Sequence, residues 1–191
     1  MDSFGSSEEN NVVDDRYLQC LIAAKKRGYV LHKNPTSAQN RCFYECIAET
    51  TGKTVEEVIY SITEYMLQNQ FVPKNGIDDD DGDEEPEFED LLSYLSDADF
   101  PHLPGRPETW RECIIALQDQ MANSVVIRST ASCFALNINV IDWNENLTEI
   151  APFDNKAETS VFLAYTGLHY MLLKPDQPEL GNMYTDEGNT H

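Results

Sequence analysis

One cysteine early in the chain and one histidine late in it constrain the fold more than any other feature. Cys42 lies at the expected start of a helix within the segment Gln39–Ile47, and His169 stands near the head of the apolar run Leu168–Leu173. Residues so far apart in the sequence can meet only in the folded chain. A thiolate nucleophile and its general base are usually distributed in this way in an intracellular enzyme. The pattern therefore predicts a fold that brings the early helix beside the late strand.

The length and composition indicate one acidic globular domain. The 191 residues are enough for one domain with a real core, and 41% of them are hydrophobic. The formal net charge is −21, which disfavours nucleic-acid partners because their affinity depends on Lys and Arg that neutralise phosphates. The same charge disfavours anionic membrane surfaces and favours basic protein partners. We expect a monomer that binds proteins and neither nucleic acid nor membranes.

The cysteines indicate a reducing compartment, cytoplasmic or nuclear. There are five of them, and their spacing is not that of a disulfide-stapled secreted domain. The first residues are polar, and no apolar run approaches the roughly 18 residues of a membrane span. No Cys-x-x-Cys spacing occurs, so we expect no zinc site and no cofactor. The cysteines other than Cys42 lie on apolar stripes and are expected to pack in the core: Cys20, Cys46, Cys113 and Cys133.

Changes in composition divide the chain into a domain and two tails. We expect a disordered acidic tail over residues 1–14, one domain over 15–174 and a flexible tail over 175–191. Ten of the 13 residues from Asp78 to Asp90 are acidic, which predicts a solvated loop over residues 75–90. This block is not a calcium loop, because Ile77 and Phe88 would occupy its first and last ligand positions.

Hydrophobic periodicity predicts helices ahead of a small sheet. Thr54 and Glu57 form the capping box that begins one helix, and Thr51-Gly52 ends the helix before it. One expected helix ends at Lys26. The others span Cys42–Glu49, Thr54 to Met66, Phe88–Leu95, Thr109–Met121 and Ile127–Leu136. The expected strands are Tyr29–Leu31, Ile138–Ile141, Leu147–Ile150, Val161–Tyr165 and His169–Leu173. This order indicates an α+β fold with a mixed or antiparallel sheet, formed mainly by the C-terminal third.

Three motifs, in this order, resemble those of the ovarian-tumour (OTU) family of cysteine proteases. The nucleophile motif Asp-Gly-Asn-Cys-Leu-Phe-Arg-Ala-Ile is similar to Gln39–Ile47 at the cysteine, the two bulky residues after it and the final Ile. The helix pattern Ile-Glu-Leu-x-Ala-Leu-Ala-x-x-Leu-Asn is similar to Ile127–Asn137, and a strand follows in both. His-Tyr at the start of a C-terminal strand is matched by His169-Tyr170. Order and spacing agree over roughly Tyr17–Lys174.

The resemblance implies a papain-related fold and a deubiquitinase-like reaction. In that reaction ubiquitin or a ubiquitin-like modifier is removed from protein lysines, with Cys42 as the nucleophile and His169 as the general base. A helix N-terminus stabilises a thiolate; Arg41 adds a positive charge, and Glu45 opposes it. The backbone N–H groups around Gln39 to Cys42, together with the Gln39 amide, are the expected oxyanion hole.

The residue that would orient the histidine is absent from both of its common places in the family. Gln39 replaces the Asp three residues before the cysteine, and Met171 replaces the Asp or Asn two residues after the histidine. The family's Trp-Gly-Gly falls on Asn123-Ser124-Val125. A triad without its orienter keeps reduced activity, because that residue mainly holds the imidazole in place. The candidates for another orienter lie in three separate segments: Asn34, Asp142 and Asp154.

Two other interpretations remain open at this point. The lost motif residues are also typical of a catalytically inactive OTU-like module that binds ubiquitin or another protein. A further alternative is an unrelated acidic scaffold in which Cys42 and His169 never meet.

Overall fold

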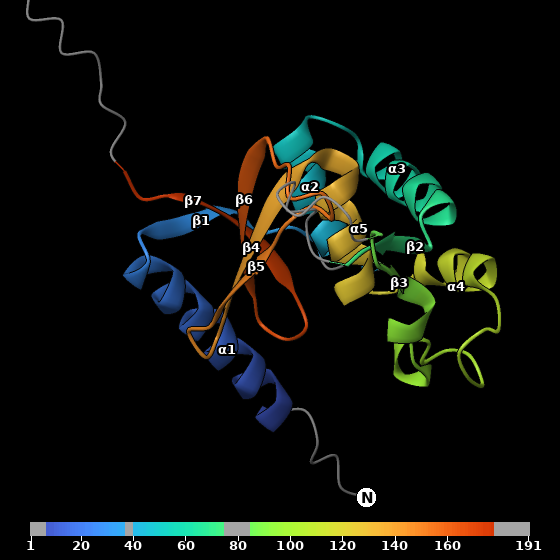
Figure 1. Ribbon diagram of the computed structural model, residues 1–191. Helices are drawn as coiled ribbons and strands as arrows, with labels where there is room; N and C mark the ends of the chain where they lie inside the picture. Colours follow the sequence, from blue (N-terminus) through green and yellow to red (C-terminus); the bar gives the residue numbers. More distant parts are fainter. Residues whose placement is uncertain (1–6, 37–39, 75–84, 178–191) are drawn as a thin grey trace, which may run out of the picture.

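The computed structural model describes residues 7–36, 40–74 and 85–177, with side chains from residue 15 onward. Within these ranges the chain forms a five-stranded sheet with helices on both faces (Figure 1). The sheet has the order β1-β7-β6-β4-β5, with the bounds β1 Tyr29–Lys33, β4 Leu136–Asp142, β5 Leu147–Ile150, β6 Thr159–Tyr165 and β7 Tyr170–Pro175. β4 and β6 are parallel and the other neighbours are antiparallel. The predicted α+β class and mixed sheet are confirmed.

Helix α1 (Ser7–Lys26) covers one face of the sheet. It begins at Ser7, earlier than the expected tail boundary at residue 14. The sequence did not predict these first turns, because the apolar stripe of the helix begins only at Tyr17. It ends where predicted, with Lys25 and Lys26 in its last turn and Gly28 in the left-handed region at φ +84°. In the described ranges, neither this 20-residue helix nor any other is long and apolar enough to cross a membrane.

Helices α2 (Cys42–Thr51) and α3 (Val55–Gln68) lie on the opposite face of the sheet (Figure 1). Gly52 ends α2 in the left-handed conformation at φ +70°, which a residue without Cβ adopts at little cost. The Thr54 side chain accepts from the Glu57 amide, and the Glu57 side chain accepts from the Thr54 amide. The predicted capping box is therefore confirmed, and it separates the two helices sharply.

A small second sheet occupies part of the region that we expected to be an acidic loop. β2 (Phe71–Pro73) pairs with β3 (Phe88–Asp90) in antiparallel register. Residues 75–84 of the expected loop lie outside the described residues. The acidic composition hid β3, because three paired residues are too short to show a period of two. The short helix expected over 88–95 is the 3₁₀ turn η2 (Leu91–Tyr94), followed by η3 (Asp97–Asp99).

Helices α4 (Trp110–Leu117) and α5 (Ser124–Phe134) complete the layer that contains α2 and α3. α4 begins at a second capping box, formed by Thr109 and Glu112, and ends before the expected Met121. α5 begins earlier than expected, because the Asn123 side chain accepts from the Val126 amide and caps it.

Alternation along the central strands divides the core between the two faces of the sheet. Tyr170 and Leu172 of β7 pack with α2 to α5, whereas Met171 and Leu173 pack against α1. The same alternation occurs in β4 and β6, as expected for strands with helices on both faces. It turns Tyr170 towards the layer that contains Cys42.

Candidate active site

Cys42 and the start of β7 meet in the fold, as the sequence predicts. Cys42 is the first residue of α2, and its side chain is 1% exposed. The backbone N–H of Tyr170 donates to the Cys42 Sγ atom at 3.5 Å, across 128 positions of sequence. His169, the residue before Tyr170, therefore lies beside the start of α2. This contact argues against a scaffold in which the two segments remain apart.

The thiol of Cys42 is buried among backbone donors. Burial raises its pKa, whereas hydrogen bonds from the backbone of Tyr170, Phe43 and Cys42 itself lower it. The charge of Glu45 raises the pKa further. Arg41 precedes the helix and makes no side-chain cap, and its guanidinium instead pairs with Glu56 at 2.9 Å. The helix N-terminus is thus directed at the sulfur, but burial holds the thiol pKa above its ordinary value.

Asn34 is the candidate orienter that contacts the histidine. Its Oδ1 atom lies 2.7 Å from His169 Nε2, across 135 positions of sequence. A neutral imidazole that donates from Nε2 has its lone pair on Nδ1, so this contact favours one tautomer. Burial lowers the pKa of His169 and the nearby Glu45 carboxylate raises it. The resulting pKa lies below the ordinary value for histidine, which favours the neutral ring at pH 7.

The other two candidate orienters make local hydrogen bonds instead. The Asp142 carboxylate accepts from the backbone amides of Asn144 and Asn146 at 2.8 and 3.0 Å. The Asp154 carboxylate accepts from the Lys156 amide at 2.9 Å. Both are the side-chain-to-backbone bonds by which Asp stabilises turns. Among the three candidates, only Asn34 has a hydrogen bond to His169 in the described part of the chain.

Aromatic rings support the segment that carries His169. Tyr165 and Tyr170 stack with their centroids 4.4 Å apart, and Phe43 of α2 meets Tyr170 edge-on at 5.4 Å. The Tyr165 hydroxyl also donates to the Gly167 carbonyl at 2.8 Å. The turn between β6 and β7 is therefore fixed by Tyr165 on one side and Tyr170 on the other, and Phe43 connects it to α2.

The N-terminal helix contributes a residue to the same turn. The Arg16 guanidinium lies over the Trp143 ring, 4.5 Å from its centroid. A Cβ atom on Gly167 would lie 3.1 Å from the Arg16 side chain and 3.2 Å from the Trp143 ring. The sequence did not predict this contact; the feature that could have indicated it is the turn at Thr166-Gly167, where Gly167 has a positive φ of +93°.

The expected oxyanion-hole residue Gln39 lies outside the described residues. Cys20, Cys46 and Cys113 are buried as predicted, whereas Cys133 is half-buried. Burial raises the pKa of Cys20 and of Cys133 to about 11. In the described residues, no group of three or more His, Cys, Asp or Glu side chains is arranged to hold a metal ion.

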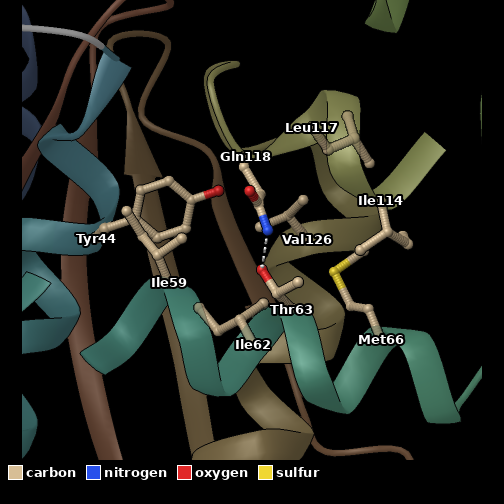
Figure 2. A pocket seen from close by; sticks show the side chains of 9 residues that line it. All are labelled: Tyr44, Ile59, Ile62, Thr63, Met66, Ile114, Leu117, Gln118 and Val126. Carbon is tan, nitrogen blue, oxygen red and sulfur yellow. Dashed lines mark hydrogen bonds between the residues drawn. The ribbon is translucent and has the colours of Figure 1, made fainter. Parts of the chain in front are cut away.

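Figure 2 shows a small, mainly apolar pocket between helices. Helices α2 to α5 line it, with the residues Tyr44, Ile59, Ile62, Thr63, Met66, Ile114, Leu117, Gln118 and Val126. Gln118 Nε2 donates to Thr63 Oγ1 at 3.1 Å, so these two polar side chains satisfy each other. None of these lining residues is a cysteine, a histidine or a charged residue, and we assign the pocket to packing between helices.

The chain has little similarity to known proteins. No protein-family model and no curated protein matches the chain. Among solved structures, an ovarian tumor (OTU) domain in complex with ubiquitin is similar to this chain at 15% identity and a TM-score of 0.48. The similarity covers 76% of this chain and 70% of that one. The function is therefore inferred from the residues of this chain.

Proposed function

We propose that the chain is an OTU-like cysteine isopeptidase that removes ubiquitin or a ubiquitin-like modifier from protein lysines. The observation that carries this proposal is the 3.5 Å contact between the Tyr170 amide and Cys42 Sγ, which brings His169 to the start of α2. The hydrogen bond between His169 and Asn34 adds an orienter that the family motifs did not predict. The three motifs in OTU order supply the choice of substrate class.

The first half of the reaction forms a thioester. His169 takes the proton from the Cys42 thiol, and Sγ attacks the carbonyl carbon of the isopeptide bond. The tetrahedral intermediate collapses with cleavage of the C–N bond, and the imidazolium returns its proton to the departing lysine amine. The modifier is then held as an acyl group on Cys42.

The second half of the reaction releases the modifier. His169 takes a proton from water, and the hydroxide attacks the thioester carbonyl. Cleavage of the C–S bond releases the modifier, which leaves as a carboxylate after losing its acid proton to solvent, and the His169 imidazolium returns its proton to the Cys42 thiolate. Backbone N–H groups at the start of α2 are the proposed donors to the oxyanion, with Gln39 as a further proposed donor.

Asn34 provides orientation in this scheme. With Nε2–H donated to Asn34 Oδ1, the lone pair on Nδ1 is the proton acceptor. The amide orients the ring through this hydrogen bond. Because it carries no charge, it stabilises the imidazolium form of His169 less than a carboxylate would. We therefore expect a working but slow enzyme.

The burial of Cys42 supports a second candidate, an inactive module that binds ubiquitin or another protein. The thiol is 1% exposed and its pKa is raised, whereas an activated nucleophile has a lowered thiol pKa. A module of this kind would keep the fold and the binding face and would not form a covalent intermediate.

A ubiquitin with a C-terminal thiol-reactive warhead separates the two candidates. Wild type, Cys42→Ala and His169→Ala are incubated with it, and the intact mass of each is measured. An isopeptidase forms an adduct that is absent in Cys42→Ala and slow to form in His169→Ala. Ubiquitin binding by folded wild type without an adduct supports the inactive module. If neither occurs, ubiquitin is the wrong partner, and the same test is made with related modifiers.

A further inference from the structure

Glu45 is a charged residue in an unusual environment beside the site. It lies in the first turn of α2, three residues after Cys42, where the OTU motif has Arg. Its Oε2 atom is buried and has no hydrogen-bond partner in the described part of the chain. An unsatisfied carboxylate oxygen costs folding free energy and is not usually retained without a reason. The position of Glu45 suggests that this reason lies in the site.

The other oxygen of Glu45 ties α2 to the segment that carries Asn34. Thr36 Oγ1 donates to Glu45 Oε1 at 3.0 Å. Thr36 stands two residues after Asn34, with Pro35 buried between them. Pro35 restricts the backbone, so a restraint on Thr36 is transmitted to Asn34. A continuous set of contacts therefore leads from Glu45 through Thr36 and Asn34 to His169.

The charge of Glu45 also acts on both proposed reacting groups. It raises the pKa of Cys42, adding to the larger effect of burial, and raises the pKa of His169 against the larger effect of burial. The other charged side chains in the groove beside Glu45 are Lys33 of β1, Glu49 of α2 and Lys53 after α2. Lys33 is paired with Glu49 at 3.2 Å, and Arg41, just before the helix, is paired with Glu56 at 2.9 Å. In the described residues, neither these two cations nor Lys53 has a hydrogen bond to Glu45.

We propose that Glu45 is a positioning residue for the Cys42–His169 pair, which fixes the Asn34 segment through Thr36 and places a negative charge in the first turn of α2. This inference rests on the proposed function for its catalytic meaning. Glu45 has two separable effects in this proposal. One is geometric and depends on the hydrogen bond from Thr36; the other is electrostatic and depends on the negative charge.

Three variants separate these effects. Glu45→Gln keeps an oxygen that accepts from Thr36 and removes the charge, Glu45→Ala removes both, and Thr36→Val removes only the hydrogen bond. Glu49→Gln, one turn further along the same helix, is the matched control for a lost charge. Two readouts are titrated against pH: alkylation of Cys42 by iodoacetamide, with Cys42→Ala as background, and the His169 ring signal in NMR, assigned with His169→Gln. Capture by the ubiquitin warhead gives the rate.

The two effects predict different patterns. In Glu45→Gln and Glu45→Ala both titration midpoints fall by about half a pH unit or more, because a nearby negative charge has been removed. In Thr36→Val the midpoints stay in place and the rate of capture falls about threefold to tenfold, in line with one lost hydrogen bond. Glu45→Ala shows both changes, and Glu49→Gln shows neither.

Two results would overturn the proposal. Unchanged midpoints in Glu45→Gln would remove the electrostatic effect, and wild-type capture rates in Thr36→Val and Glu45→Ala would remove the geometric one. If wild type is not captured at all, the proposed function fails while the titrations still decide the electrostatic effect. The geometric effect is then read from the ¹⁵N shift of His169 Nε2, which reports the hydrogen bond to Asn34.

Discussion

Asn34 Oδ1 lies 2.7 Å from His169 Nε2, although the two residues are 135 positions apart. Asn34 precedes Cys42 in the chain, in the loop after β1, and His169 precedes β7. β1 and β7 are neighbours in the sheet, with Leu31 opposite Leu173. The pairing of these strands brings the loop and the histidine together, so the contact depends on the register of the sheet.

We expect Asn34→Ala to slow capture by the ubiquitin warhead roughly tenfold to a thousandfold, because the imidazole loses its orientation and preferred tautomer. Asn34→Asp keeps the acceptor and should retain most of the rate. Asp154→Asn is the control, since Asp154 accepts only from the local Lys156 amide in the described residues. Equal rates for Asn34→Ala and wild type would show that Asn34 does not orient the base.

Gly167→Ala should destabilise the fold by about 1–3 kcal/mol, because Gly167 combines a positive φ with a crowded site. The new Cβ would lie 3.1 Å from Arg16 and 3.2 Å from Trp143. Gly28→Ala is a matched control, since Gly28 has a similar φ of +84° and nothing within 4 Å of the added Cβ. Urea unfolding should show the larger loss for Gly167→Ala. Equal losses would mean that backbone strain alone accounts for the effect.

Trp110→Phe should cost about 0.5–1.5 kcal/mol of folding free energy, because it removes one buried hydrogen bond while the Met66 carbonyl still accepts from the Asn69 amide. Trp110 Nε1 donates to the Met66 carbonyl at 2.6 Å, and this bond joins the start of α4 to the end of α3. Chemical denaturation measures the change. Ile115→Ala on the exposed face of α4 is the control, since Ile115 is 53% exposed and Ala is the better helix former; a similar loss there would show that the effect does not come from the bond to Met66.

Stability should fall at alkaline pH as buried thiols are forced to ionise. Burial raises the pKa of Cys20 to about 11, so the unfolded chain loses this proton at lower pH than the folded one. The contribution of Cys20 is complete below its unfolded pKa and is lost as pH rises through the folded pKa. Urea unfolding between pH 8 and pH 11 should therefore show a smaller decline in Cys20→Ala than in wild type. Parallel curves would indicate that Cys20 takes no part.

The sequence by itself determined the features that depend on neighbouring residues. Gly52 marks the end of α2, and the capping box of Thr54 and Glu57 marks the start of α3. Both could be predicted because caps satisfy backbone groups within a few residues. The short apolar runs of β6 and β7 also predicted strands from neighbouring residues. The meeting of Cys42 with the His169 segment was also predicted, from the chemistry that such a pair can perform.

Only the tertiary structure selected Asn34 over Asp142 and Asp154, since all three lie in segments with equally suitable side chains. The pairing of β1 with β7 brings Asn34 to His169. The sequence does not show this pairing, because sheet neighbours are set by long-range hydrogen bonds that leave no local pattern. The close approach of Arg16 to Gly167 and the burial of Glu45 Oε2 arise in the same way. Local propensity places elements along the chain, whereas the packing of distant elements determines which side chains share a site.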